Sequence, residues 1–395
     1  SVTHRVLLYA VLEVGSILFL LGQRRPPLAT LSWILAFLSL PVLSLVCYFL
    51  FGPRKLKRRN VRRELARHLA AHHGPHRTQP LPETLASRHW LLAQARVATE
   101  CGSAPPRQVQ GLQILIDGDA TYAAIEAAMQ KAEHHIHVEY YIFKPDEIGT
   151  RWRDLLTEKA RAGVKVRMLV DAVGSGRCRK DFWKPLREAG GEVRVFNPPR
   201  FLPFRPSMVN FRTHRKIVVI DALYGFTGGI NVERVESVAC TGTTAWRDTH
   251  LALKGSAALD LQRIFLEDWL YAGTSSGHLA RLDKALTTPQ DILAWFPLPA
   301  DEPRDESQPW VQIIDSGPDR SEYAIYRYFF AAMSSARRRI WITTPYFIPD
   351  ESILTALTIA AGRGLDVRLL VPMESDQLLT GLAASTFVEE VLARR

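Results

Sequence analysis

Cysteine is scarce in this chain. The 395 residues contain four, and no two of them form a C-x-x-C pair: Cys47, Cys101, Cys178 and Cys240. This spacing indicates neither a disulfide framework nor a cysteine-rich zinc site, and it fits a reducing compartment. The cluster of His134, His135 and His137 has no Cys or Asp set nearby that would complete a metal site. We therefore expect no metal and no cofactor.

Acidic residues are also in deficit, with 40 Asp and Glu against 50 Lys and Arg, so the net charge is +10. A basic run, Arg54 to Arg63, follows two apolar segments, Val6 to Gly22 and Ala29 to Phe51. The second segment is long enough to span a bilayer, and we expect the two to form a transmembrane hairpin. The positive-inside rule then places the following domain in the cytoplasm. Glu13 leaves open that the first segment is short, tilted or interfacial, and Pro41 could kink the second.

The basic run also predicts a partner. Lys and Arg beside a membrane attract anionic headgroups, by about 1 kcal/mol for each residue near the surface. We therefore expect contact with anionic phospholipids. A solvated helix remains the alternative reading of this run.

One short segment carries the chemistry. It reads H-x-K-x4-D-x6-G-G-x-N, and its residues are His214, Lys216, Asp221, Gly228, Gly229 and Asn231. If the segment is a strand, His214 and Lys216 leave the same face. The β-branched run after Lys216 suits a strand that is buried on both faces.

These residue types can attack a phosphodiester. An imidazole can form a covalent phospho-histidine, which splits one difficult displacement into two easier steps. Lys216 and Asn231 would stabilise the charge on the phosphate oxygens, so no metal is required. A nucleophilic histidine needs a carboxylate to fix its tautomer, and Asp248 is our candidate. Asp221 ends the strand and could instead be structural.

The chain contains an internal duplication. Residues 112–117 match 311–315, residues 140–147 match 344–351, and residues 162–170 match 363–371. Each copy reads strand, helix, strand, helix, strand, which indicates a parallel or mixed sheet covered by helices. The second copy has no H-x-K-x4-D of its own, and residue 1 is Ser rather than Met. We expect an incomplete chain.

The predicted organisation has five parts. Residues 1–52 form the membrane hairpin and 53–106 a polybasic and helical connector. Residues 107–296 form the first repeat, 297–309 a Pro-rich acidic linker, and 310–395 the incomplete second repeat.

The motif resembles the HKD signature of the phospholipase D superfamily. Its surroundings are similar to bacterial cardiolipin synthases over nearly the whole chain, in the segments 210–216, 225–231, 246–250, 316–319 and 344–349. The resemblance implies an α/β fold: a phospholipase D-like, pseudo-duplicated mixed sheet with flanking helices after the transmembrane hairpin. It also implies catalytic roles for His214, Lys216, Asp221, Asn231 and Asp248. Substrate contacts would come from Arg212, Gly228 and Gly229.

The implied function is a phosphatidyltransferase at the inner (plasma) membrane, multi-pass, with a cytoplasmic catalytic domain. It would make cardiolipin from two phosphatidylglycerol molecules and release glycerol. Its partners would be phosphatidylglycerol, cardiolipin and the bilayer, with no nucleic acid; homo-oligomerisation stays open. In the family two HKD motifs meet at one site, so we expect the 395-residue chain alone to be inactive or severely impaired.

Three other functions are alternatives for a chain with this motif. A phospholipase D-type hydrolase would resolve the intermediate with water. An endonuclease would suit the basic surface, but a nuclease needs no membrane hairpin. A non-catalytic membrane protein would not need the intact motif. The identity of the acceptor alcohol, and which HKD histidine attacks, are left open by the sequence.

Overall fold

The computed structural model describes residues 14–22, 27–51, 89–198, 212–273, 307–317, 323–373 and 378–393. The basic run 54–63 and residues 297–306 of the linker 297–309 lie outside these residues, as does the part of the first apolar segment before residue 14.

The apolar N-terminal region forms short helices. The second apolar segment, which we expected to span the bilayer with a possible kink at Pro41, is divided into α2, Pro27–Ser39, and α3, Pro41–Phe51. Proline disfavours helical backbone at the residue before it, and the break falls at Leu40. Leu20, Phe37 and Tyr48 pack together as a small apolar cluster. Within the described ranges, no helix combines the length and the apolarity that crossing a membrane requires.

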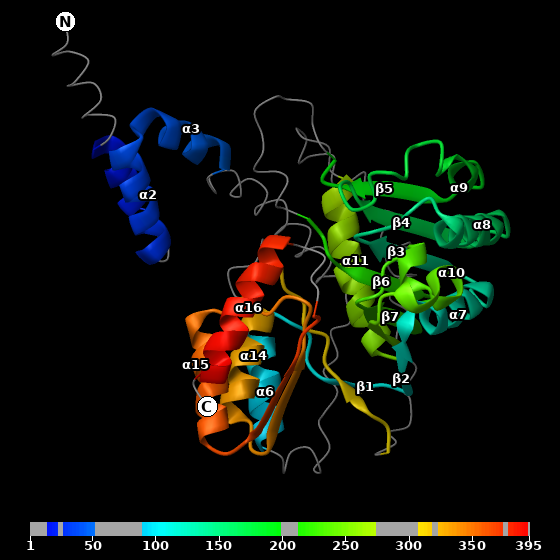
Figure 1. Ribbon diagram of the computed structural model, residues 1–395. Helices are drawn as coiled ribbons and strands as arrows, with labels where there is room; N and C mark the ends of the chain where they lie inside the picture. Colours follow the sequence, from blue (N-terminus) through cyan, green and yellow to red (C-terminus); the bar gives the residue numbers. More distant parts are fainter. Residues whose placement is uncertain are drawn as a thin grey trace, which may run out of the picture.

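A seven-stranded mixed sheet forms the body of the first repeat (Figure 1). Its strand order is β2-β8-β7-β6-β3-β4-β5. The strands are β2 (Gly111–Ile116), β3 (His135–Tyr140), β4 (Lys165–Asp171), β5 (Glu192–Phe196), β6 (Lys216–Ile220), β7 (Tyr224–Gly228) and β8 (Thr249–Lys254). β3, β4 and β5 are parallel, and the remaining neighbours are antiparallel.

Helices cover both faces of this sheet. α11 (Ala257–Gly273) lies against one face, and α7 (Asp117–Gln130), α8 (Glu147–Arg161) and α9 (Lys184–Glu188) lie on the other (Figure 1). The main core packs Tyr122 and Ile125 of α7 and Trp152 of α8 against Val138 and Val218 of the sheet. β6 is therefore buried on both faces, as its unbroken β-branched sequence predicts.

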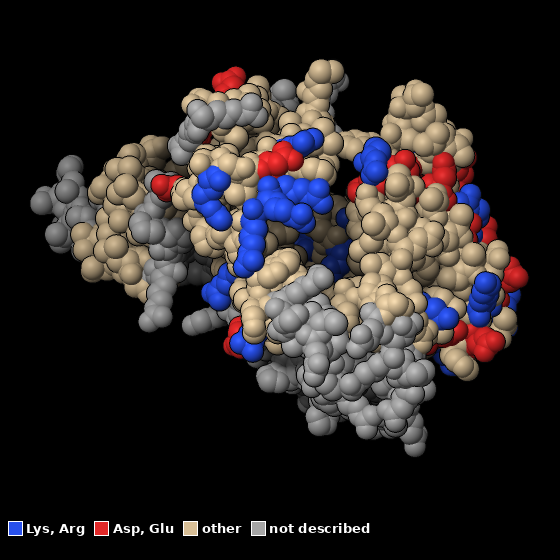
Figure 2. Space-filling view, turned by 90° about the horizontal axis from the view of Figure 1, so that it is seen from below, with Lys and Arg blue, Asp and Glu red and all other residues tan. Residues whose placement is uncertain are grey.

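The second repeat forms a smaller body. It contains α14 (Ala324–Ser335), β10 (Arg339–Thr343), α15 (Glu351–Gly362), β11 (Asp366–Leu370) and α16 (Leu378–Ala393). β10 and β11 are parallel, like β3 and β4. The carboxylates of Asp146 and Asp350 cap α8 and α15, at matching positions of the two copies. Basic side chains gather on the face of the molecule that is seen from below (Figure 2).

A helix contact and a strand pairing connect the second repeat to the segments that precede it in the chain. α6 (His89–Glu100) packs against α14, and Gln94 Nε2 donates to the Ala331 carbonyl at 3.1 Å. β1 (Arg107–Gln108), at the start of the first repeat, pairs antiparallel with β9 (Trp310–Val311), at the start of the second. The strand–helix–strand–helix–strand order is present in both copies, as β2-α7-β3-α8-β4 and β9-α14-β10-α15-β11. The five-part division of the chain stays a prediction.

Candidate active site

The residues around the start of β6 point alternately to opposite sides. His214 is exposed to solvent, whereas its neighbour Thr213 is buried and donates through Oγ1 to Glu139 Oε1 at 2.7 Å. Arg215 pairs with Asp268 on α11, on the same side as Thr213. Successive side chains of extended backbone alternate in this way. His214 is therefore accessible to a substrate while the residues on either side of it are anchored.

His214 rests on an aromatic ring. Its imidazole stacks on Tyr141, with ring centroids 3.8 Å apart and planes at 21°. Lys216 Nζ donates to the His214 carbonyl at 3.0 Å and lies 5.7 Å from the centroid of the Tyr141 ring. Partial burial and the Lys216 charge lower the pKa of His214, against the opposing charge of Asp171. The imidazole is thus neutral near pH 7, the form that can act as a nucleophile.

Lys216 is the cation of the site. Burial lowers its pKa, and the charges of Glu236, Asp248 and Glu233 oppose that shift. The three carboxylates favour the protonated form of Lys216. Within the part of the chain that the structure describes, the ammonium group of Lys216 forms no ion pair with any of them. Lys216 can therefore turn toward a phosphate oxygen.

Within the described part of the chain, no hydrogen bond joins the Asp248 carboxylate to the His214 imidazole. Its Oδ1 accepts from the backbone N–H of Thr249 at 2.6 Å, and its carboxylate lies over Gly229. The carboxylate that acts electrostatically on His214 is Asp171, which ends β4. The role of Asp248 as tautomer partner stays a prediction. Asp171 was missed, although a carboxylate at the carboxyl end of a buried parallel strand is a typical position for a site residue.

Asp171 has a well-defined setting. Its side chain is fully buried, and Oδ1 accepts from the backbone N–H of Val173 at 2.8 Å. Arg212 Nη1 lies 3.7 Å from the same oxygen and donates to the Asn197 carbonyl at 2.9 Å. Burial raises the pKa of Asp171. Arg212, which we expected at the substrate, thus reaches the site through this carboxylate.

Asn231 is held by a carboxylate that sequence reasoning also missed. Its backbone N–H and its side-chain Nδ2 both donate to Glu236 Oε1, at 3.2 and 3.3 Å. Its carbonyl accepts from the Tyr122 hydroxyl at 2.6 Å. Burial raises the pKa of Glu236 to about 7. The amide that we expected to bind phosphate is therefore engaged with a group whose charge changes near neutral pH.

Asp221 lies at the far end of β6 from His214. Its carboxylate accepts from the backbone N–H groups of Glu133, His134 and His135, at 2.8, 2.9 and 2.8 Å. Its φ of 52° places it in the left-handed region, where Asp is tolerated in turns. This geometry favours the structural alternative for Asp221, because the side chain fastens the start of β3.

The two glycines of the motif have a steric role. A Cβ at Gly228 would lie 2.5 Å from His250 Cα, and one at Gly229 would lie 2.2 Å from Asp248 Oδ2. Lys216, Gly228 and His250 are neighbours on β6, β7 and β8. His250 is fully buried, and burial together with the Lys216 charge lowers its pKa to about 3. The structure thus gives these glycines a packing function; a substrate contact stays a prediction.

The histidine cluster on β3 is part of the packing under α11. His137 stacks on Phe265 with centroids 4.7 Å apart, and its Nδ1 lies 2.6 Å from Gln262 Nε2. Across the residues that the structure covers, no group of three His, Cys, Asp or Glu side chains could hold a metal ion.

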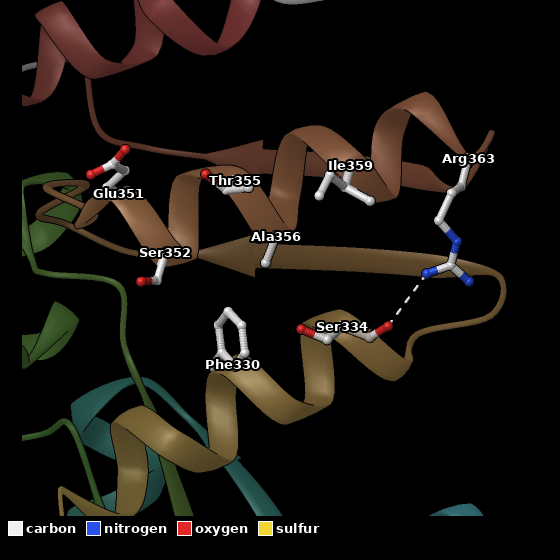
Figure 3. Close-up of a pocket in the computed structure, with 8 residues that line it drawn as sticks. All are labelled: Phe330, Ser334, Glu351, Ser352, Thr355, Ala356, Ile359 and Arg363. Carbon is white, nitrogen blue, oxygen red and sulfur yellow. Dashed lines mark hydrogen bonds between the residues drawn. The ribbon is translucent and has the colours of Figure 1, made fainter.

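A pocket of about 470 Å³ lies elsewhere, between α14 and α15 (Figure 3). Phe330 and Ile359 line it, and Arg363 at one end donates to the Ser334 carbonyl at 3.3 Å. It contains no residue of the His214 motif. We therefore place the candidate site at His214 rather than in this pocket.

Comparison with known proteins identifies the family of this chain. The family described as "Cardiolipin synthase, PLD-like domain" matches residues 125–269 and 329–394. The chain belongs to this family. A second family, "Phospholipase_D-nuclease N-terminal", matches residues 11–53. The cardiolipin synthase match includes His214, Lys216, Asn231 and Asp248, and extends into both repeats.

Curated relatives match nearly the whole chain. A cardiolipin synthase of Geobacillus kaustophilus is 38% identical over 98% of this chain and 74% of its own length. Cardiolipin synthase 1 of Bacillus anthracis is 37% identical over the same shares. Among solved structures, a phosphatidylserine synthase of Haemophilus influenzae aligns with a TM-score of 0.51 at 14% identity, over 75% of this chain and 72% of its own. These comparisons confirm the phospholipase D-like mixed sheet with flanking helices that the sequence predicted.

Proposed function

We propose that this protein is a cardiolipin synthase. It transfers the phosphatidyl group of one phosphatidylglycerol to the primary hydroxyl of a second, and glycerol is released. The observation that carries the proposal is the pairing of an exposed, neutral His214 with Lys216 in a cardiolipin synthase-family chain. The identity of the acceptor alcohol is supported by membership of the family and by no contact among the described residues.

His214 performs the first displacement. An imidazole nitrogen attacks phosphorus, the P–O bond to glycerol breaks, and a phosphatidyl-histidine forms. The stacked Tyr141 ring limits rotation of the imidazole, so fewer orientations compete with the attacking one. The departing glycerol oxygen needs a proton, a role that the family gives to the histidine of a second HKD motif. The hydroxyl oxygen of the second phosphatidylglycerol then attacks phosphorus, the P–N bond to His214 breaks, and the hydroxyl proton would pass to that second histidine.

Lys216 stabilises the charge that develops during both displacements. Its ammonium group leaves the His214 carbonyl and donates to a non-bridging phosphate oxygen. The Asn231 amide would share this work on release from Glu236. Protonation of Glu236 weakens its hold on Asn231 and removes a negative charge beside the phosphate, so both effects favour substrate binding below about pH 7.

The membrane supplies the substrate. We propose that the apolar segments within residues 1–52 hold the protein at the inner membrane and that the basic run 54–63 contacts anionic lipids on the cytoplasmic side. The match of residues 11–53 to a phospholipase D-related N-terminal family supports a shared role for this region. Whether it crosses the bilayer can be tested by labelling engineered cysteines from each side of sealed vesicles.

The deciding experiment uses the full-length protein in vesicles that contain labelled phosphatidylglycerol. Cardiolipin and free glycerol are expected from the wild type and are lost in His214→Ala. His134→Ala is the matched control, because His134 is another exposed histidine of the same repeat. Phosphatidic acid without cardiolipin would make water the acceptor and the protein a phospholipase D. Equal turnover by wild type and His214→Ala would refute the assigned nucleophile.

A further inference from the structure

A cluster of buried charges lies directly behind the nucleophile. Its members come from four segments: Glu139 of β3, Arg215 of the His214 motif, Arg263, Glu267 and Asp268 of α11, and Asp315. Each side chain is largely or wholly removed from solvent, and Arg215 itself is 17% exposed. Buried charges persist when they are paired, because an uncompensated one is costly.

Asp315 is the member of this cluster that the second repeat contributes. Its carboxylate lies 3.9 Å from Arg215 Nη2 and 3.6 Å from Arg263 Nη2, with the side chain only 2% exposed. The chain just before it packs onto the same face: Val311 and Ile313 contact the apolar cluster that contains Ile217 of β6. The opening strand of the second repeat therefore reaches the back of the catalytic strand.

Arg215 joins this cluster to the site. It stands between His214 and Lys216, and its side chain leaves the opposite face of the backbone. Burial opposes its charge, but the carboxylates of Asp268, Glu139, Asp315 and Glu267 more than offset this and raise the pKa of Arg215. Arg215 thus stays charged, and its position is set by α11 on one side and by the second repeat on the other. A displacement of Arg215 moves the two flanking catalytic residues with it.

We infer that Asp315 is a positioning residue for His214, through which the seating of the second repeat on the first sets the geometry of the nucleophile. This inference rests on the proposed function for its kinetic consequences. Asp315 acts on His214 through its ion pair with Arg215, the residue that follows His214 in the chain. A small change in the attacking geometry can cost up to about 100-fold in rate, so the effect should fall on kcat rather than on KM.

The test compares three variants in the full-length protein. Asp315→Asn removes the charge and keeps the shape, and Asp315→Glu restores the charge. Arg263→Gln removes a second ion-pair partner of Asp315 and leaves the His214 motif unchanged. We expect Asp315→Asn to lower kcat by about tenfold or more with KM within about twofold, and Asp315→Glu to recover most of the loss. Arg263→Gln should retain kcat within about threefold, even if the melting temperature falls as far as in Asp315→Asn.

A second measurement does not depend on turnover. The rate at which diethyl pyrocarbonate modifies His214, followed by peptide mass spectrometry across pH, reports the exposure and pKa of the imidazole. Asp315→Asn should change this rate by about threefold or more while the exposed His134 is unchanged, and Arg263→Gln should change neither. If the wild type makes no cardiolipin but the His214 rates separate in this way, the proposed function fails and the positioning role stands.

Two outcomes would overturn the inference. One is wild-type kcat and wild-type His214 modification in Asp315→Asn. The other is a loss of kcat that follows the fall in melting temperature equally in Asp315→Asn and Arg263→Gln, because that pattern describes general stability.

Discussion

Glu236→Gln should make the protein more stable at alkaline pH. Glu236 is 6% exposed, and burial raises the pKa of its carboxyl group from 4.5 to about 7. The folded state therefore holds a proton on this group over a pH range in which the unfolded chain has released it. The stability that this proton contributes to the folded state is fully present below pH 4.5 and is lost as pH rises through about 7.

The size of the effect follows from the shift. Each pKa unit corresponds to about 1.4 kcal/mol, so the shift on Glu236 corresponds to about 3 kcal/mol when complete, of which about 2.5 kcal/mol falls between pH 5 and pH 8. Glutamine does not titrate, and its Oε1 can still accept from Asn231. The variant should therefore gain about 2 to 3 kcal/mol relative to wild type on going from pH 5 to pH 8.

Urea unfolding at these two pH values measures the gain, with the fluorescence of the buried Trp152 and Trp183 as the signal. The comparison of variant with wild type at each pH cancels other titrating groups, including His250, whose lowered pKa destabilises both proteins in acid. A difference between variant and wild type that is the same at both pH values would refute the assignment of a raised pKa to Glu236.

Three further predictions concern the motif. Lys216→Ala should lower kcat by about 10²-fold or more, because a donor to the phosphate is lost; unchanged turnover in the lipid assay would remove Lys216 from the mechanism. Gly228→Ala should destabilise the fold by about 1 to 3 kcal/mol, since the new Cβ meets backbone atoms at 2.5 and 2.6 Å. Gly362→Ala, where nothing lies within 4 Å, is its control and should not destabilise. Asp221→Asn should cost about 1 to 3 kcal/mol by weakening three bonds to backbone N–H groups, with kcat of the remaining folded protein close to wild type; a loss of kcat at unchanged stability would return Asp221 to the catalytic set.

The parts that could be predicted from the sequence depend on local patterns. The β-branched run after Lys216 marks a strand buried on both faces, and β6 has that position. The repeated segments predicted a strand–helix–strand–helix–strand order, which the structure has in both copies. Alternation within a strand also predicted that His214 and Lys216 share a face, since Arg215 between them points to α11.

The parts that were missed depend on which strands become neighbours. Tyr141 and Asp171 reach His214 because β3 pairs with β4 on one side and with β6 on the other. Nothing in the spacing of residues 141, 171 and 214 specifies that pairing. Asp248 was chosen for its chemistry; its carboxylate lies over Gly229, and its role beside His214 stays a prediction. The division of the apolar run at Pro41 agrees with the kink that the sequence allowed there, because proline disfavours helical backbone at the residue before it.

The contact between Asp221 and the start of β3 has a consequence for the order of folding. β6 and β7 are joined by a short turn in which Asp221 and Ala222 both have positive φ, so the contacts within this hairpin are local, and hairpins form within about 1 to 10 microseconds. Once formed, it presents the Asp221 carboxylate at its tip. The amides that bind it lie 86 to 88 residues earlier in the chain, and bringing them together requires closure of that long loop. We therefore expect Asp221 to bind the start of β3 after the β6–β7 hairpin has formed, so that this contact joins β3 to the hairpin late in the assembly of the central sheet.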